Sequence, residues 1–361
     1  MSEWKTTELG NVITLKRGYD LPQQKRKTGL IPIFSSSGVS GSHNTAMVKA
    51  PGVITGRYGT IGQVFYSDTD FWPLNTTLYV EDFHGNDPQF IYYFLKTLAW
   101  EKFTSASAVP GINRNTVHKE IVQIPDVETQ KEIAKYLLMI DKKIRNNEQI
   151  NDNLYDLLQS VYQLQFGVTS GNAAEGILSD ICSYTKDRIA VSELSLGNYY
   201  STENMLPGKA GFTEATSLPT TPQTTRCNAG DVLVSNIRPY FKKIVLCHSE
   251  GGCSTDVLCF APKAPAYSAY LFCTLYADRF FDFMVAGSKG TKMPRGDKQQ
   301  IMTYPVYIPT ESELTAFADF ATPILSQIHG NNEENARLEH LRDTLLPKLM
   351  SGEIDVSAID I

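Results

Sequence analysis

The chain has 361 residues, of which 42% are hydrophobic, and a formal net charge of −6. This length accommodates two or three domains with cores of their own. No apolar run approaches the roughly 20 residues of a membrane span, and we expect neither a signal peptide nor a location outside the cytoplasm. The acidic balance argues against binding to nucleic acid through overall charge alone, although local basic patches remain compatible with it.

Residues 1–124 predict a mixed, strand-rich domain. The segments PGVITGRYGTIGQVFYS and TTLYVED alternate β-branched and aromatic residues with glycine, which is typical of strands and tight turns. The segment PQFIYYFLKTLAWEKFTS predicts one helix. Three residues of this domain are weaker candidates for a binding site: Ser36 in a short serine-rich turn, and Lys16 and Arg17 in a polar segment near the start of the chain.

Residues 125–166 predict a long helix, which from about Glu128 to Phe166 would be about 58 Å long at about 1.5 Å per residue. Asp126 is expected to cap its start, with Glu128 in the first turn. Apolar residues follow in steps of four and three, which is typical of a helix that pairs with another. This stripe comprises Ile133, Leu137, Ile140, Ile144, Leu154, Leu158 and Val161, interrupted by Asn147 and Asn151.

The second half predicts the same plan. After a polar linker, residues 167–175, a second strand-rich domain covers residues 176–308, a second long helix residues 309–350, and a C-terminal tail residues 351–361. AGDVLVSNIRPYFKKIVLCHS corresponds to the first strand pair, and AYSAYLFCTLYADRFFDFMVAG predicts the helix. The second apolar stripe comprises Phe317, Ala321, Ile324, Ile328, Leu338, Leu341 and Leu345, interrupted by Asn331 and Asn335.

A constant offset relates the two long helices. Pro125 matches Pro309, an offset of 184 (309 − 125), and the same offset carries Pro110 onto Pro294 and Asn147 onto Asn331. Near the start of each domain the offset is smaller, because Leu9 matches Leu178 at an offset of 169 (178 − 9). The second domain has therefore gained residues in its loops, whereas the helix has gained none. We therefore predict an internal repeat of two domain-plus-helix units.

The two helices are expected to pair with each other in an antiparallel coiled coil, because each has an apolar stripe that needs a partner. The domains would then lie at opposite ends of a helical spacer, related by a pseudo-two-fold axis. Buried asparagines can fix the register of such a pair. We assign that role to Asn147, Asn151, Asn331 and Asn335; the alternative is that these four side chains face solvent.

The six cysteines all lie in the second half, and none is spaced as C-x-x-C. A repeat that required disulfides or zinc would carry them in both copies, so we interpret them as reduced core thiols of a cytoplasmic protein.

Motifs for catalysis are lacking. Asn236-Ile237-Arg238-Pro239-Tyr240 only partly matches a methyltransferase motif, and the sequence has neither a phosphate-binding G-x-x-x-x-G-K-[ST] loop nor H-E-x-x-H. The histidines have no ligand spacing. The sequence therefore predicts no catalytic residue, no bound metal and no cofactor held by this chain.

Basic, glycine-rich loops are the candidate binding elements. The turn Gly56–Gly62 carries Arg57 and Tyr58, and arginine binds phosphate or the edge of guanine. A second cluster, residues 108–114, ends in Arg114. The corresponding loops of the second domain contribute Arg238, Tyr240, Lys242 and Lys243, then Lys289, Lys292 and Arg295, with Thr202 and Asn204 as weaker candidates. Solvated surface charge is the alternative for any one of these clusters.

The chain resembles the specificity subunit of a type I restriction–modification system. The resemblance is carried by GRYGTIGQVFYSD, VSNIRPYFKKI, GSKGTKMPR and the ending LRDTLLPKLMSGEIDV. The resemblance covers essentially the whole chain. It implies an α+β fold with two target-recognition domains, each recognising one half of a split sequence in double-stranded DNA, and two helices as a spacer. It also implies that two modification subunits, which bind S-adenosylmethionine, and two restriction subunits in the complete complex supply all catalysis. The alternative is a structural adaptor that organises protein partners without binding a DNA sequence.

Overall fold

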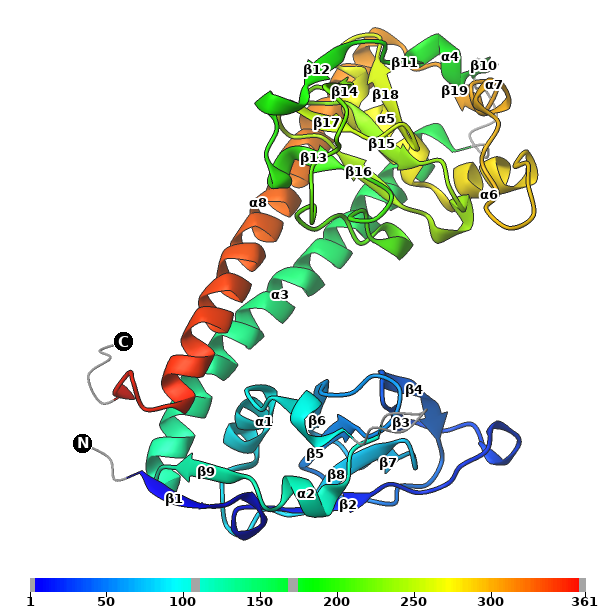
Figure 1. The fold of residues 1–361 in the computed structure, drawn as a ribbon. Coiled ribbons are helices and arrows are strands. Elements are labelled where there is room, and N and C mark those ends of the chain that lie inside the picture. The colour runs from blue at the N-terminus through cyan, green and yellow to red at the C-terminus, as the bar shows by residue number, and fades with distance from the viewer. Residues whose placement is uncertain (1–3, 105–110, 168–174, 357–361) are drawn as a thin grey trace. The chain divides into compact units, whose positions relative to one another are not determined.

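The computed structural model describes residues 4–104, 111–167 and 175–356 (Figure 1). The predicted binding positions 108–110, most of the predicted linker and the end of the predicted tail lie outside these ranges. The chain divides into two compact units. Unit 1 comprises residues 1–146 and 334–361, and unit 2 comprises residues 147–333, so each unit contains half of each long helix.

The described residues of unit 1 form three sheets. The longest has four antiparallel strands in the order β2 (Thr14–Arg17), β8 (Thr77–Asp82), β5 (Gly52–Gly56) and β6 (Val64–Ser67). A three-stranded sheet has the order β4 (Gly38–His43), β3 (Ile31–Ser35) and β7 (Trp72–Pro73), and β1 (Lys5–Glu8) pairs with β9 (Ile121–Ile124). Every residue of β5 is buried, as expected for a central strand.

Helix α1 (Pro88–Lys96) packs on β5 and β6 (Figure 1). The Asp87 side chain caps it by accepting a hydrogen bond of 2.8 Å from the Phe90 amide, and proline occupies its first turn. The predicted single helix over this segment is wrong: α1 ends at Lys96, and a separate 3-10 turn spans Trp100–Phe103. Thr97 ends the helix because its hydroxyl donates to the carbonyl of Phe94 at 2.8 Å.

Unit 2 has two four-stranded sheets. One has the order β11 (Cys182–Tyr184), β18 (Val257–Pro262), β15 (Val232–Ser235) and β16 (Ile244–Leu246), all antiparallel. The other has the order β12 (Arg188–Ala190), β14 (Gln223–Cys227), β17 (Gly251–Cys253) and β13 (Tyr199–Tyr200). Strand β10 (Glu175–Ile177) pairs with β19 (Pro305–Tyr307).

Two helices, not the single predicted one, follow β18 in unit 2. They are α5 (Tyr267–Tyr276), which packs on β15, β16 and β18, and α6 (Asp278–Ala286). Ala277 separates them because its backbone is extended, at φ −63° and ψ 138°. All six cysteines of the chain are free and buried in this unit, as predicted.

The long helices are α3 (Val127–Phe166) and α8 (Glu311–Met350). Asp126 caps α3 as predicted: one of its carboxylate oxygens accepts hydrogen bonds from the Glu128 and Thr129 amides, at 3.1 and 3.0 Å. These bonds lower the pKa of Asp126, the Thr129 amide contributing most. No helix in the described ranges is long and apolar enough to cross a membrane.

In each unit the halves of α3 and α8 contact each other in opposite chain directions. In unit 1, Ile144 accepts a hydrogen bond from Asn335, and Asp141 forms an ion pair with Arg342 at 2.9 Å. In unit 2, Asn151 and Asn331 are hydrogen-bonded at 2.7 Å. The apolar residues of the predicted stripe are buried or half-buried, with one exception: Leu341 is 46% exposed. The neighbouring Arg342 turns inward instead, because its guanidinium bonds the buried Asp141.

Candidate functional site

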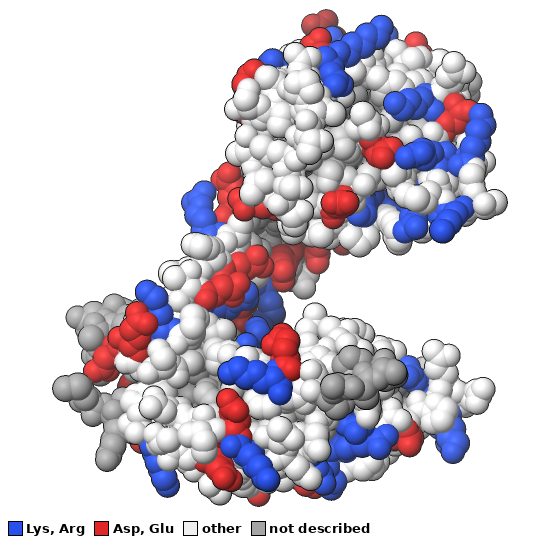
Figure 2. Space-filling model, viewed as in Figure 1, with Lys and Arg blue, Asp and Glu red and all other residues white. Residues whose placement is uncertain are grey.

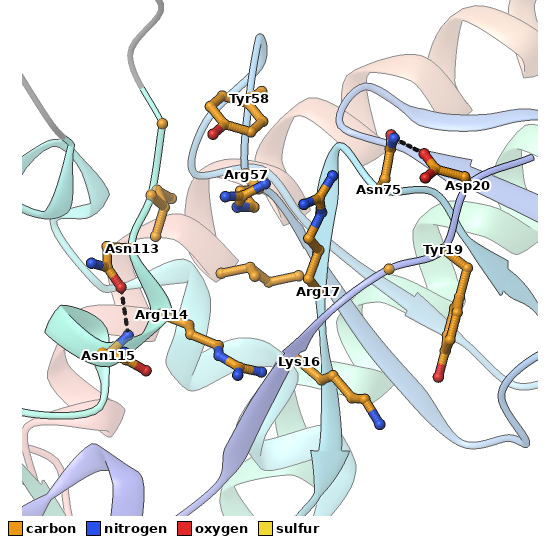
Figure 3. A pocket seen from close by; sticks show the side chains of 14 residues that line it. Lys16, Arg17, Tyr19, Asp20, Arg57, Tyr58, Asn75, Asn113, Arg114 and Asn115 are labelled. Atoms are coloured by element: carbon orange, nitrogen blue, oxygen red, sulfur yellow. Dashed lines mark hydrogen bonds between the residues drawn. The ribbon is translucent and has the colours of Figure 1, made fainter. Parts of the chain in front are cut away.

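A groove of about 800 Å³ in unit 1 brings together side chains from separate parts of the sequence (Figure 3). Arg17 comes from the end of β2, Arg57 from the loop after β5, and Arg114 from the start of α2 (Arg114–Val117). Lys16 and Tyr58 also line it. Five of the six residues that the sequence singled out in this domain therefore lie around one cavity.

The backbone around Arg57 is fixed at both sides. Its amide donates to the Thr76 carbonyl at 2.8 Å, and its carbonyl accepts from the Ile112 amide at 3.0 Å. The guanidinium carbon lies 4.3 Å from the centroid of the Tyr58 ring, a cation–π contact that orients the charge. Gly111 pairs with Tyr58, and a side chain there would overlap the tyrosine ring, so this close approach requires glycine.

The three arginines differ from Lys16 in their partners. Lys16 Nζ lies 2.5 Å from a carboxylate oxygen of Glu81, and that hydrogen bond raises the pKa of Lys16. Within the described ranges Arg17, Arg57 and Arg114 form no ion pair, and Arg114 makes only a long hydrogen bond of 3.5 Å to the Leu15 carbonyl. Their positive charge is therefore available to a ligand in the groove.

His118 connects two walls of this groove. Its Nε2 accepts a hydrogen bond of 2.9 Å from the Leu15 amide of β2, which requires an unprotonated nitrogen. Burial, and then the positive charge of Arg114, lower the pKa of His118. The neutral ring consequently ties β2 to the segment that carries Arg114.

The sequence did not predict four polar residues of the groove: Tyr19, Asp20, Asn75 and Asn115. The Asn75 amide donates to the Asp20 carboxylate. Tyr19 and Asp20 directly follow Lys16 and Arg17 in the sequence, a signal that could have found them. Ser36, in contrast, does not line the groove: it lies in the turn between β3 and β4, beside Gly59.

In unit 2 the two predicted loops also run side by side. The Arg238 amide donates to the Pro294 carbonyl at 2.8 Å, and the Gly296 amide donates to the Asn236 carbonyl at 3.3 Å. The second bond corresponds to the one between Ile112 and Arg57, because 296 − 112 equals the repeat offset of 184. Asn236, not Arg238, thus occupies the backbone position of Arg57.

Most predicted cations of unit 2 have partners in the protein. Lys242 lies 2.9 Å from Asp278, Lys289 2.5 Å from Asp297, and Arg295 3.0 Å from Asp256. The Lys243 ammonium donates to the Thr202 carbonyl at 2.5 Å, and burial lowers its pKa. Lys292 is exposed and has no ion pair within the described ranges. Lys and Arg nevertheless gather on the α6 side of this unit, next to carboxylates (Figure 2).

Two weaker candidates have structural roles. Thr202 contributes its carbonyl to Lys243. Asn204 is 6% exposed, and its amide donates to the carbonyls of Tyr199 and Thr213 at 2.9 and 2.8 Å. Its side-chain oxygen accepts from the Ser201 amide at 2.7 Å. The Asn204 side chain thus stabilises the loop after β13, which favours a structural role over contact with a ligand.

The four asparagines of the long helices are buried, which excludes the alternative in which they face solvent. Asn147 is 1% exposed, Asn151 and Asn331 are 6% exposed, and Asn335 is 9% exposed. Asn151 accepts from Asn331 and donates to the Asn332 side chain at 2.8 Å. Hydrogen bonding of this kind satisfies polar groups that burial would otherwise destabilise.

Comparison with known proteins agrees with this geometry. Residues 1–155 match the family described as the type I restriction modification DNA specificity domain. A 132-residue segment is 25% identical to the type I restriction enzyme EcoDI specificity subunit of Escherichia coli, covering 35% of this chain and 29% of that protein. The chain therefore spans less than a third of that relative.

The fold resembles the crystal structure of a type I restriction–modification system S subunit from M. genitalium. The TM-score is 0.65 at 17% identity, over 97% of this chain and 96% of that one. The match to the specificity-domain family thus covers the first 155 residues, and the likeness to the solved S subunit shows that the chain as a whole has the same fold.

Proposed function

We propose that this chain recognises a DNA sequence as the non-catalytic specificity subunit of a type I restriction–modification complex. The observation that carries the proposal is the groove of unit 1, where three arginines without carboxylate partners in the described ranges surround one cavity. Arginine donates two parallel hydrogen bonds to phosphate or to guanine O6 and N7. Asp20 adds an acceptor, which suits the amino group of cytosine.

Each unit recognises one half of a split target in this proposal. The backbone hydrogen bond from Ile112 to Arg57 in unit 1 has a counterpart from Gly296 to Asn236 in unit 2. The main antiparallel sheets of the two units also have corresponding strand orders. These correspondences support an internal repeat. The different partners of the cations support different half-sites. In the part of the chain that the structure describes, the arginines of the unit 1 groove have no carboxylate partner, whereas Lys242, Lys289 and Arg295 of unit 2 are held by carboxylates.

The paired helices set the distance between the half-sites. Opposite chain directions of α3 and α8 within each unit, together with buried asparagines that bond across the pair, support an antiparallel coiled coil with a fixed register. Two modification subunits that bind S-adenosylmethionine, and two restriction subunits, associate with this chain and supply catalysis. Partners that complete a clamp around DNA would account for its net charge of −6.

A structural adaptor that has lost DNA binding is the second candidate. The ion pairs of Lys242, Lys289 and Arg295 favour it, because cations satisfied within the protein need no phosphate. The arginines of the unit 1 groove argue against it, since within the described ranges they form no ion pair, and positive charge gathered in a groove in this way has no evident structural role.

A salt series separates the two candidates. The full chain, co-purified with its modification subunit, is titrated onto double-stranded DNA at several salt concentrations. A DNA-binding subunit gives a logarithm of affinity that falls steeply with the logarithm of salt, by about 0.9 for each phosphate contacted. It also prefers its target over other duplexes. An adaptor gives neither the slope nor the preference.

A further inference from the structure

The turn between β15 and β16 of unit 2 exposes two adjacent aromatic rings. Tyr240 is 51% exposed and Phe241 is 39% exposed, within a 3-10 turn, η8 (Pro239–Phe241). Their ring centroids lie 4.8 Å apart. An aromatic pair left in water at the tip of a turn is unfavourable unless a partner covers it.

The conformation of this turn is unusual on both sides. Arg238 and Lys242, which flank it, both adopt the left-handed region, at φ 49° and φ 51°. Residues other than glycine rarely adopt this backbone conformation, and such backbone strain is found mainly where function requires a defined geometry. Between them, Pro239 restricts the backbone further.

Contacts with the rest of unit 2 hold the turn in place. The Arg238 amide bonds the Pro294 carbonyl at 2.8 Å, and the Lys242 carbonyl accepts from the Lys209 amide at 2.9 Å. The Lys242 ammonium also pairs with Asp278 at the start of α6, on which η8 packs. The two rings are thus presented by a braced turn and need little ordering when a partner binds.

We infer that Tyr240 and Phe241 form an aromatic wedge, which contacts a base step of double-stranded DNA in the half-site of unit 2. This inference rests on the proposed function. Apolar side chains inserted between base pairs unstack the step and bend the duplex, and aromatic rings stack on any base. Arg238 flanks the rings, and its Nε has no hydrogen-bond partner within the described ranges, which fits a partner that carries phosphates beside its apolar base surfaces.

The wedge gives the two units different means of recognition. In unit 1 the corresponding turn ends in Gly59 to Gly62 and presents the guanidinium of Arg57. In unit 2 the cations are largely paired and the exposed groups are aromatic. Recognition by unit 2 consequently depends on stacking and on the free energy needed to unstack a base-pair step of the DNA. That free energy is lowest at pyrimidine–purine steps.

The test uses the full chain with its modification subunit and a duplex containing the target, with 2-aminopurine placed at successive positions of the half-site of unit 2. The double variant Tyr240→Ala, Phe241→Ala is compared with Leu196→Ala, a control in the same unit that removes a side chain 41% exposed. We expect the double variant to lose about ten-fold or more in target affinity. The salt slope stays unchanged, because no phosphate contact is removed.

Further readouts separate the alternatives. The wild type should increase 2-aminopurine fluorescence at one step, and the double variant should not, whereas Tyr240→Phe should retain both affinity and fluorescence. Unchanged affinity in the double variant overturns the wedge. So does loss of the modification subunit with target binding intact, which would make the rings a protein interface. A wild type without target preference would instead contradict the proposed function itself.

Discussion

Replacing Arg57 with alanine tests the central residue of the unit 1 groove. Its guanidinium is oriented by Tyr58 at 4.3 Å and has no ion pair within the described ranges, so little free energy is spent on releasing it from the protein. A guanidinium bound to guanine discriminates against other bases by about 1–3 kcal/mol. Arg57→Ala should therefore weaken binding of the target by about 5- to 150-fold, at about 1.4 kcal/mol for each factor of ten.

The assay is competition binding with duplexes in which each half-site is altered separately. The variant should lose its base preference in one half-site and keep it in the other. The matched control is Lys96→Ala, which removes another cation that lies over a tyrosine ring, at 4.9 Å from Tyr92, on α1 and outside the groove. Lys96→Ala should leave both preferences intact.

Two results would contradict a base contact by Arg57. If binding to all duplexes weakened equally and the salt slope fell by about 0.9, Arg57 would contact a phosphate and not a base. If Lys96→Ala had the same effect as Arg57→Ala, the loss would reflect the stability of unit 1 and not the groove.

Four further predictions address the groove, the helices and pH. Tyr58→Leu should weaken target binding about two- to five-fold, whereas Tyr58→Phe should not, because only the ring is needed for a cation–π contact of about 0.5–1 kcal/mol. Arg342→Ala should lower the free energy of unfolding by about 3 kcal/mol in urea titrations, since it leaves the buried Asp141 carboxylate without its cation; an unchanged midpoint would contradict this. Inserting four residues after Asn151 should change the spacing between methylated half-sites, and altered bases at the old spacing would contradict the spacer. The His248 ring stacks on His329 at 3.8 Å; withdrawal of the ring from water, and then the charge of His329, lower the pKa of His248 to about 4 although part of the residue is exposed. Stability should therefore fall as the pH drops from about 6.5 towards 4, and His248→Gln should remove part of that fall in the urea midpoint.

The long helices could be predicted from the sequence because their information is local. Steps of four and three residues give the apolar stripe, and Asp126 marks a start that the structure confirms. Leu341 departs from the prediction because the ion pair of Arg342 and Asp141 spans 201 positions of sequence, a separation that no local pattern encodes. Likewise, Ala277 separates α5 from α6 although alanine favours helix, so packing must override propensity there.

The loops that form the site could be predicted from the sequence, but not the full set of residues that line the groove. Arg57 and Arg114 stand out as cations among glycines, whereas Asn75 enters the groove through a bond to Asp20 that spans 55 positions. Asn236 takes the backbone position of Arg57 because the offset between the units drifts in their loops. Whether a cation forms an ion pair also depends on tertiary contacts. Arg57 and Arg295 both lie next to glycine in a predicted loop, but within the described ranges only Arg295 forms an ion pair, with Asp256.

Mapping of methylated bases in the genome, with this subunit present and absent, shows whether the chain selects a split DNA target. We expect methylation that depends on this chain and falls at one split sequence, with two defined half-sites at a constant spacing. In cells that carry Arg57→Ala, one half-site should relax while the other and the spacing persist. Methylation that is unchanged without the chain, or a single continuous target, would contradict it.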